Sequence, residues 1–367
     1  MTERAARADA RHLPALDGLR GIAVLLVLWE HLPDGLTGPG LLAFLKRWVM
    51  PGPRGVDVFF VLSGFLITRI LLADKARGMP LKSFLIRRFL RIFPIYYLTI
   101  LAVLAYEPGP NLVYCALYLG NFYWAYHPTL LSLHHTWSLS VEEHFYLLWP
   151  LIVYRLSFAS ARRVAIWGFI PFAIACGLVL WRLDGTVPGW QLIYMSTFTR
   201  VGSLALGAAF AFHEGELRGD RRYALRVGGA LAAIAVLAIP VHLRVTGCGK
   251  LLALLVSTAA TSGVCVLAAI RLSDGDWRPK RLLTNGVLRF TGRISYGLYI
   301  YHYPIYRALG LIRDVPDPDL PASFSLLAVS GTFALATVSY YGLEQRILRF
   351  KDRFREPALP AVERGIS

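Results

Sequence analysis

The stretch VDVFFVLSGFLITRILLA at residues 56–73 decides the fold class, because Asp57 and Arg69 are its only charged residues. An apolar stretch of about 18 residues or more with few charges is typical of a transmembrane helix. Comparable apolar runs lie at 16–33, 92–106, 138–156, 164–181, 194–213, 227–243, 251–270, 290–312 and 324–345. The sequence therefore predicts an all-α, polytopic membrane bundle of about ten transmembrane helices.

The overall composition agrees with this prediction. Hydrophobic residues make up 56% of the 367 residues, charged residues only 17%, and the mean hydropathy is +0.50. A soluble domain carries about 25% charged residues, so an ordinary soluble enzyme is excluded. The net charge of +16 would suggest a nucleic-acid partner in a soluble protein. Here the basic residues lie in short segments between apolar runs, so we expect a membrane topology signal, lipid contact and no nucleic acid.

The distribution of basic residues also predicts the topology. The run at 112–124 is short and ends in polar and aromatic residues, so we expect it to be re-entrant or interfacial. Without it, the segments on one side hold most of the lysines and arginines, whereas 107–137 on the other side holds none. The positive-inside rule then places both termini in the cytoplasm and the protein in the inner membrane. We expect one domain over 1–367, with a helical bundle at about 16–345 and a basic cytoplasmic tail at 346–367.

Two ionisable residues in the first apolar run form the first candidate site. Arg20 and His31 fall on nearly the same helix face, about 16 Å apart along the axis. Arg20 alone could reach toward lipid headgroups, and His31 alone could be a hydrogen-bonded core residue. Because ionisable groups inside membrane spans are costly, the pair on one face favours a functional site.

The segment HTWSLSVEEHFYLLWP at 135–150 holds the second candidate site. Glu143 completes an S-x-x-E spacing typical of a helix capping box, which gives it a structural explanation. Glu142 has no such explanation, so it is the functional candidate. In the predicted topology His135 and Glu142 lie at about the depth of His31. A histidine with a carboxylate partner can act as a general base toward a hydroxyl group.

A third cluster contains Arg87, Arg88 and Arg91 at the cytoplasmic start of a span. These residues fit the positive-inside rule, but arginine side chains also bind phosphate groups in bidentate fashion. Asp57 either complements a helix N-terminus or belongs to a site, and His302 either shapes a site or packs as a hydrogen-bonded core residue. Ser63 and Gly64 are expected to allow close helix packing rather than to take part in chemistry. The four cysteines show no zinc spacing, so no metal is expected.

Several motifs together carry a resemblance to a known family. These motifs are LPALDGLRGIA at 13–23 followed by His31, GVDVFFVLSGFLIT at 55–68, RRFLRIFPIYY at 87–97, HTWSLSVEEHFYLLWP at 135–150 and ISYGLYIYHYPI at 294–305. In this order, over nearly the whole chain, they resemble the acyltransferase-3 family. Its members are integral membrane O-acyltransferases that modify sugars, surface polysaccharides and some macrolides. The resemblance implies ten helices, an acyl-CoA donor and an acceptor hydroxyl.

The resemblance also assigns expected roles to residues. The family's R-x10-H pair falls on Arg20 and His31, and its S-x-x-x-E pattern falls on Ser138 and Glu142. His31 is expected to act as general base and Glu142 to orient it. Residues expected to bind the acyl-CoA, in the first place acetyl-CoA, are Arg20, Arg87, Arg88 and Arg91. Residues expected to shape the site or hold the substrate are Asp57, His135, Trp137, Ser138, Glu143 and His302.

The function expected from the sequence is therefore transfer of an acyl group, in the first place acetyl, to a hydroxyl of a carbohydrate or cell-envelope glycan. Two alternatives stay open at this point. The acceptor could instead be a secondary metabolite such as a macrolide. More distantly, a helical bundle with buried His, Arg and Glu residues could be a proton-coupled transporter or a lipid-linked sugar carrier.

Overall fold

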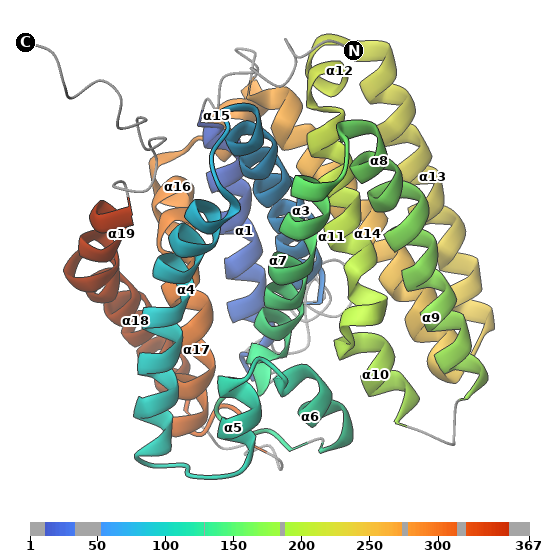
Figure 1. Cartoon of the computed structure of the whole chain (residues 1–367). Coiled ribbons are helices and arrows are strands. Elements are labelled where there is room, and N and C mark those ends of the chain that lie inside the picture. Colours follow the sequence, from blue (N-terminus) through green and yellow to red (C-terminus); the bar gives the residue numbers. More distant parts are fainter. Residues whose placement is uncertain are drawn as a thin grey trace, which may run out of the picture.

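The computed structural model describes residues 12–33, 53–127, 129–183, 188–273, 278–313 and 321–351. Within these ranges the regular structure is entirely helical and includes no strand. The helices run roughly alongside one another as a bundle (Figure 1). The predicted all-α bundle is confirmed.

The helices differ widely in length. The longer ones are α1 (Pro14–Glu30), α3 (Pro53–Ala76), α4 (Leu81–Leu104), α7 (Trp137–Arg155), α9 (Ile170–Arg182), α11 (Thr197–Phe212), α13 (Arg221–Arg244), α14 (Gly247–Leu272), α17 (Ser295–Ala308) and α18 (Ala322–Ser339). The shorter ones are α5 (Asn111–Ala116), α6 (Gly120–Tyr126), α8 (Phe158–Arg163), α10 (Gly189–Met195), α12 (Glu214–Gly219), α15 (Arg278–Leu283), α16 (Gly286–Arg293) and α19 (Gln345–Lys351). A 3₁₀ turn, η3 (His134–Thr136), precedes α7, and π-helical turns at η4 (Val164–Phe169) and η5 (Tyr340–Glu344) lead into α9 and α19.

Several of these helices are long and apolar enough to cross a bilayer. In the described part of the chain there are 5 such stretches: Gly55–Ala76, Phe158–Arg182, Arg221–Arg244, Gly247–Leu272 and Ala322–Phe350. The chain is thus a multi-pass membrane protein. The other predicted spans also coincide with helices, but α1 has 17 residues and α11 has 16. Ten spans and cytoplasmic termini stay predictions, and residues 1–11 and 352–367 lie outside the described ranges.

The short run at 112–124 does not span the membrane. It contains parts of α5, which has 6 residues, and α6, which has 7. A spanning helix needs about 20 residues, because each residue adds about 1.5 Å. A re-entrant or interfacial position of this segment stays a prediction, and both helices lie at one end of the bundle (Figure 1).

The core of the bundle depends on close contact between α3 and α11. A Cβ atom added at Gly64 would overlap the carbonyl oxygen of Leu204, and one added at Gly207 would overlap that of Val61. Small residues at such contacts let the helix backbones approach closely. The interpretation of Gly64 as a packing residue is confirmed.

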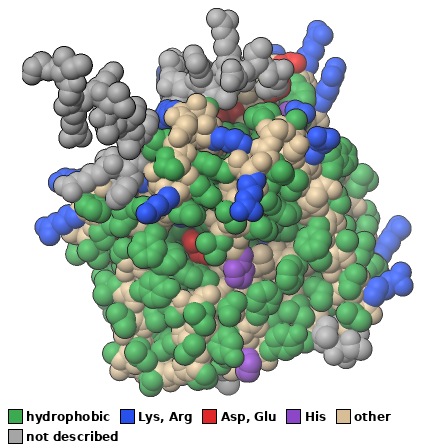
Figure 2. All heavy atoms as spheres, in the orientation of Figure 1, with side chains coloured by type: hydrophobic (Ala, Val, Ile, Leu, Met, Phe, Trp, Pro, Cys, Tyr) green, Lys and Arg blue, Asp and Glu red, His purple; other side chains and the backbone are tan. Residues whose placement is uncertain are grey.

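The two ends of the bundle differ in charge. We call the end at which α4, α13 and α15 begin the basic end, and the end that carries α5, α6 and residues 309–313 the opposite end. On the face in Figure 2, lysine and arginine side chains gather toward the upper, basic end, above a largely hydrophobic surface. This asymmetry is what the positive-inside rule describes.

Candidate functional site

A cavity of about 580 Å³ lies between α1, α3, α4, α7, α16 and α17. Five arginines line it: Arg20, Arg88, Arg91, Arg289 and Arg293. Three carboxylates also line it: Asp17, Glu142 and Glu344. Among the described residues of the cavity wall arginines therefore outnumber carboxylates, so this wall favours an anionic ligand. Its size falls within the range of about 300–1,000 Å³ that is usual for small-molecule sites.

Arg20 links the cavity to α17. Its Nη2 donates a hydrogen bond of 2.9 Å to Oγ of Ser295, the first residue of that helix. At the other end of α1, His31 contacts His302 of the same helix α17. Arg20 and His31 therefore face the same neighbouring helix, as their spacing predicted.

Arg88 is held by three neighbours on α7. Its guanidinium lies 3.9 Å from Glu142, 3.8 Å from Glu143 and 3.7 Å from the centre of the Tyr146 ring. Its Nε is buried and has no hydrogen-bond partner among the described residues. These contacts fix the Arg88 side chain at the cavity wall.

Glu142 belongs to this arginine-lined cavity rather than to His31. Oγ of Ser63 donates a hydrogen bond of 2.6 Å to Glu142, and Arg88 lies on its other side. His135 precedes Glu142 by seven residues, which is about 10 Å along a helix. Of these two residues, His135 lies at the depth of His31 in the bundle and Glu142 does not. The expected pairing of Glu142 with His31 is therefore wrong.

The expected capping box at Glu143 is wrong. Helix α7 begins at Trp137 with Thr136 as N-cap, so Ser140 lies inside the helix. The Ser140 hydroxyl donates to the carbonyl oxygen of Thr136 instead. Glu143 is explained by its ion pair with Arg88.

The basic motif divides into two parts. Arg88 and Arg91 line the cavity, whereas Arg87 does not. Arg87 forms a buried ion pair with Asp74 at the end of α3. The expectation that Arg87 lies with the other two is therefore wrong, because neighbouring helical residues point about 100° apart. Arg289 and Arg293 were missed: Arg289, just before the ninth run, indicated only topology, and Arg293 lies inside that run with no partner that the sequence could name.

A histidine cluster, formed by His31, His134, His135 and His302, lies beyond the cavity. His31 Nδ1 lies 2.9 Å from the carbonyl oxygen of Val27 and 3.3 Å from Nε2 of His302. His302 Nδ1 lies 2.6 Å from the carbonyl oxygen of Tyr299, so in a neutral His302 it is Nδ1 that carries the proton. His302 Nε2 is then an acceptor. His31 therefore carries its own proton on Nδ1, which leaves the lone pair on Nε2.

The other two histidines extend the cluster from η3. The ring centre of His135 lies 5.1 Å from that of His302, and His134 stacks at 6.1 Å on Tyr303. Burial lowers the pKa of His134 to about 4, and burial, reinforced by the neighbouring histidines, lowers the pKa of His135 well below its ordinary value. Both imidazoles are neutral at pH 7.

Tyr299 connects the cavity with the histidine cluster. Ser138 and Tyr299 both line the cavity, and their hydroxyl groups are 2.5 Å apart. The Tyr299 hydroxyl also donates a hydrogen bond of 2.9 Å to the carbonyl oxygen of His135, and its ring packs at 5.6 Å from that of His302. The arginine-lined cavity and the candidate base are therefore adjacent layers of one site.

Asp57 and Trp137 lie beside this site and not on the cavity wall. Asp57 is fully buried, 3.3 Å from Arg200 of α11, and accepts a hydrogen bond of 3.4 Å from Ser203. The Arg200 guanidinium also faces the ring of Trp137 at 5.6 Å. The alternative in which Asp57 merely complements the N-terminus of its helix does not fit this buried pair. Arg200 was missed, because nothing in one sequence pairs it with Asp57.

Among the described residues no group of three or more His, Cys, Asp and Glu side chains could hold a metal ion. The described cysteines, Cys115, Cys176, Cys248 and Cys265, are free thiols.

Comparison with known proteins gives one consistent result. Peptidoglycan O-acetyltransferase OatA of Listeria monocytogenes is 29% identical over 388 residues, covering 94% of this chain and 57% of the relative. A Bacillus subtilis protein named "Putative peptidoglycan O-acetyltransferase YrhL" is 28% identical over 376 residues, covering 92% of this chain and 55% of the relative. The chain spans little more than half the length of these relatives. No solved structure matches it significantly.

A family model described as "Acyltransferase domain" matches residues 13–341, which include the described cavity wall apart from His12, Glu344 and Leu348. All the motifs that carried the resemblance lie inside this range. The chain therefore belongs to the acyltransferase-3 family.

Proposed function

We propose that this protein transfers an acetyl group from acetyl-CoA to a hydroxyl group of a cell-envelope glycan. In this proposal it lies in the inner membrane with its basic end in the cytoplasm. The observation that carries the proposal is the arginine-lined cavity, because its wall reaches Tyr299, which contacts the histidine cluster. The donor binds in the cavity from the basic end, and the acceptor approaches the histidines from the opposite end.

The donor set of the cavity suits a ligand with several phosphates. Arginine binds phosphate through paired N–H groups. Arg88, Arg91, Arg289 and Arg293 all line the cavity with guanidinium groups. The phosphates of CoA would contact these arginines, and its thioester arm would extend past Arg20 toward Tyr299.

His31 acts as the general base in this scheme. Its Nε2 takes the proton from the acceptor hydroxyl as that oxygen bonds to the thioester carbonyl carbon. The carbon–sulfur bond then breaks, and the departing CoA thiolate takes the proton from the imidazolium. The products are an O-acetyl ester and free CoA.

Two residues position this chemistry. His302 accepts from His31 Nδ1, at 3.3 Å, and so keeps the lone pair on the reactive nitrogen. Glu142 pairs with Arg88 and accepts a hydrogen bond from Ser63. In this scheme Glu142 therefore positions Arg88 for donor binding and does not act on His31 directly. Ser138 and Tyr299 separate the two layers: their hydroxyl groups bond to each other, and the Tyr299 hydroxyl donates to the carbonyl oxygen of His135.

A glycan is the preferred acceptor because the relatives quoted above are named for peptidoglycan O-acetylation. A macrolide acceptor has no comparable support. A carrier that transfers no acyl group is disfavoured because the chain belongs to a family of acyltransferases.

The test is acetyl transfer by the detergent-purified protein. Acetyl-CoA labelled in the acetyl group is incubated with soluble peptidoglycan fragments, and both free thiol and alkali-labile acetyl on the glycan are measured. We expect both to rise together. A macrolide is tested as acceptor in a parallel reaction. If the macrolide becomes labelled and the glycan does not, the acceptor is a macrolide and not a glycan. No transfer to any hydroxyl acceptor would refute the proposal.

A further inference from the structure

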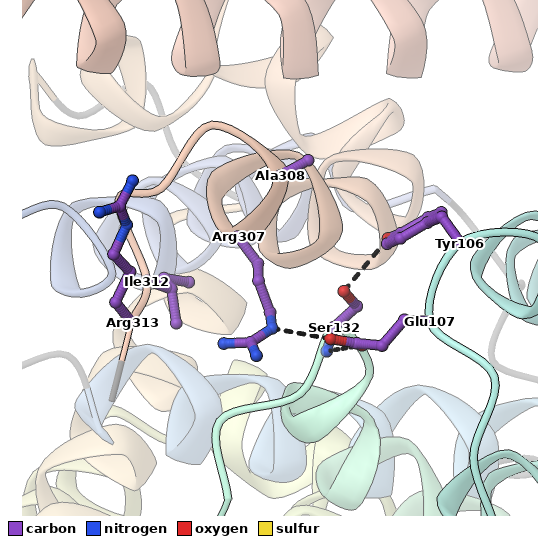
Figure 3. A pocket seen from close by; sticks show the side chains of 7 residues that line it. All are labelled: Tyr106, Glu107, Ser132, Arg307, Ala308, Ile312 and Arg313. Carbon is purple, nitrogen blue, oxygen red and sulfur yellow. Dashed lines mark hydrogen bonds and ion pairs between the residues drawn. The ribbon is translucent and has the colours of Figure 1, made fainter. Parts of the chain in front are cut away.

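A second cavity, of about 510 Å³, lies at the opposite end of the bundle. Tyr106, Glu107, Ser132, Arg307, Ile312 and Arg313 line it, together with Ala308 (Figure 3). These residues come from the end of α4, the segment before η3, and the end of α17 with its following turn. Three distant parts of the chain thus meet around one open, polar pocket, which we call the outer pocket.

Hydrogen bonds hold one wall of the outer pocket rigid. Arg307 Nε donates to Glu107 at 2.9 Å, and the backbone N–H of Ser132 donates to the other Glu107 oxygen at 2.7 Å. The Tyr106 hydroxyl donates to Ser132 Oγ at 3.1 Å, and 53% of the Tyr106 residue is exposed. Figure 3 shows Glu107 between Arg307 and Ser132, with Arg313 on the far side of Ile312.

The outer pocket has guanidinium groups in its wall. The described residues that line it include Arg307 and Arg313, and Glu107 as the carboxylate that pairs with Arg307. Among the described residues, Nε is the only part of the Arg307 guanidinium that donates a hydrogen bond, so its Nη groups stay available. A guanidinium offers five N–H donors in a planar fork that matches a carboxylate. An exposed tyrosine ring beside such a fork suits a ligand that also has an apolar sugar face.

The outer pocket is separated from the histidine cluster by one layer of aromatic side chains. Arg307 follows His302 by five residues on α17, about 7.5 Å along the axis. Ser132 precedes His135 by three residues. Ile312 packs in one apolar group with Tyr303 and Tyr306, and these rings contact His31 at 5.1 Å and His302 at 5.7 Å. Arg307 therefore lies about 1.4 helical turns beyond His302, the hydrogen-bond partner of the candidate base His31.

We propose that the outer pocket binds the acceptor through a carboxylate on the glycan, which Arg307 and Arg313 recognise. This inference rests on the proposed function and adds to it the class of acceptor: a sugar that carries a free carboxylate. The donor cavity at the basic end and the outer pocket then supply the two substrates to the histidine cluster from opposite sides.

The first test needs no variant. Purified wild-type protein is assayed with a peptidoglycan disaccharide whose sugar carboxylate is either free or converted to the amide. We expect KM for the amide to be about tenfold higher, equivalent to about 1.4 kcal/mol. Equal KM values for the two acceptors would overturn the inference, whereas failure of both acceptors would count against the proposed function itself.

The second test locates the effect. Arg307→Gln and Arg313→Gln are compared with Arg244→Gln, an exposed arginine at the same end that does not line the pocket. Arg307→Gln removes the ion pair with Glu107 and can therefore impair folding. Arg313 is exposed, so Arg313→Gln is not expected to impair folding. We expect both pocket variants to raise KM for the free carboxylate about tenfold, and to leave KM for the amide and for acetyl-CoA unchanged.

Two results would contradict the assignment. If Arg244→Gln raised KM as much as the pocket variants, the effect would be general surface charge. If the pocket variants differed from wild type only in micelles that contain anionic phospholipid, the outer pocket would be a lipid headgroup site instead.

Discussion

The neighbouring residues Arg87 and Arg88 give the sharpest test of the donor cavity. Both are arginines at the start of α4, and both match the basic motif. Arg88 lines the cavity, whereas Arg87 forms an ion pair with Asp74 and lies outside the cavity. Arg88→Gln should therefore weaken binding of acetyl-CoA, and Arg87→Gln should not.

The expected magnitude follows from the contact that is lost. A hydrogen bond to a charged group contributes about 1.5–3 kcal/mol, so losing an arginine–phosphate contact should raise KM for acetyl-CoA about 10- to 150-fold. Arg87→Gln instead leaves Asp74 buried without its ion pair. Breaking a buried pair costs about 3–5 kcal/mol, so its effect should be on stability.

The assay is thiol release at varied acetyl-CoA concentration, together with the unfolding temperature of each purified variant. Arg88→Lys keeps the charge but loses the planar fork, so it should recover part of the affinity. Adding Asp74→Asn to Arg87→Gln should restore part of the lost stability. The reasoning would be refuted if Arg88→Gln left KM unchanged, or if Arg87→Gln raised it equally.

Three further predictions concern packing, the histidine cluster and the buried ion pair. Gly64→Ala should destabilise the protein by about 1–3 kcal/mol, because the added Cβ overlaps the Leu204 backbone. Gly229→Ala, which has open space around it, should not destabilise the protein. Equal unfolding temperatures for the two variants would mean that α3 and α11 can separate freely. His302→Gln should lower kcat about 10- to 100-fold and leave KM for acetyl-CoA unchanged, because the substitution alters the hydrogen bond that orients His31. An unchanged kcat would show that His302 does not position His31. Asp57→Ala should destabilise by about 3–5 kcal/mol because Arg200 is left buried without its carboxylate, and Asp57→Ala combined with Arg200→Met should be less destabilised than Asp57→Ala alone; strictly additive losses in thermal unfolding would show that the two residues are not coupled.

The helical bundle could be predicted because membrane helices leave a strong local signal. Runs such as 56–73 and 227–243 are recognisable from apolar length alone, and both coincide with helices. The short helices α5 and α6 were also foreseeable, because 112–124 is too short to cross a bilayer. The number of spans and the topology depend on how the helices sit in the membrane. In the sequence, only the distribution of basic residues carries information about this.

The site was predictable only where one helix determines the geometry. Arg20 and His31 share a face of α1, so their common orientation follows from helical periodicity. Which helix they face depends on tertiary packing, and this is why His302 turned out to be the partner of His31. For the same reason Glu142 pairs with Arg88 of α4, and Asp57 with Arg200 of α11.

The measurement that tests the central claim most directly is free-thiol release from acetyl-CoA by purified protein, with wild type beside His31→Ala. His144→Ala is the matched control, because His144 lies on α7 in a hydrogen bond to Thr197, outside the histidine cluster. Loss of a general base should lower kcat about 10²- to 10⁴-fold. The account predicts this loss in His31→Ala with KM for acetyl-CoA nearly unchanged, and near-normal turnover in His144→Ala. Normal turnover by His31→Ala would contradict it.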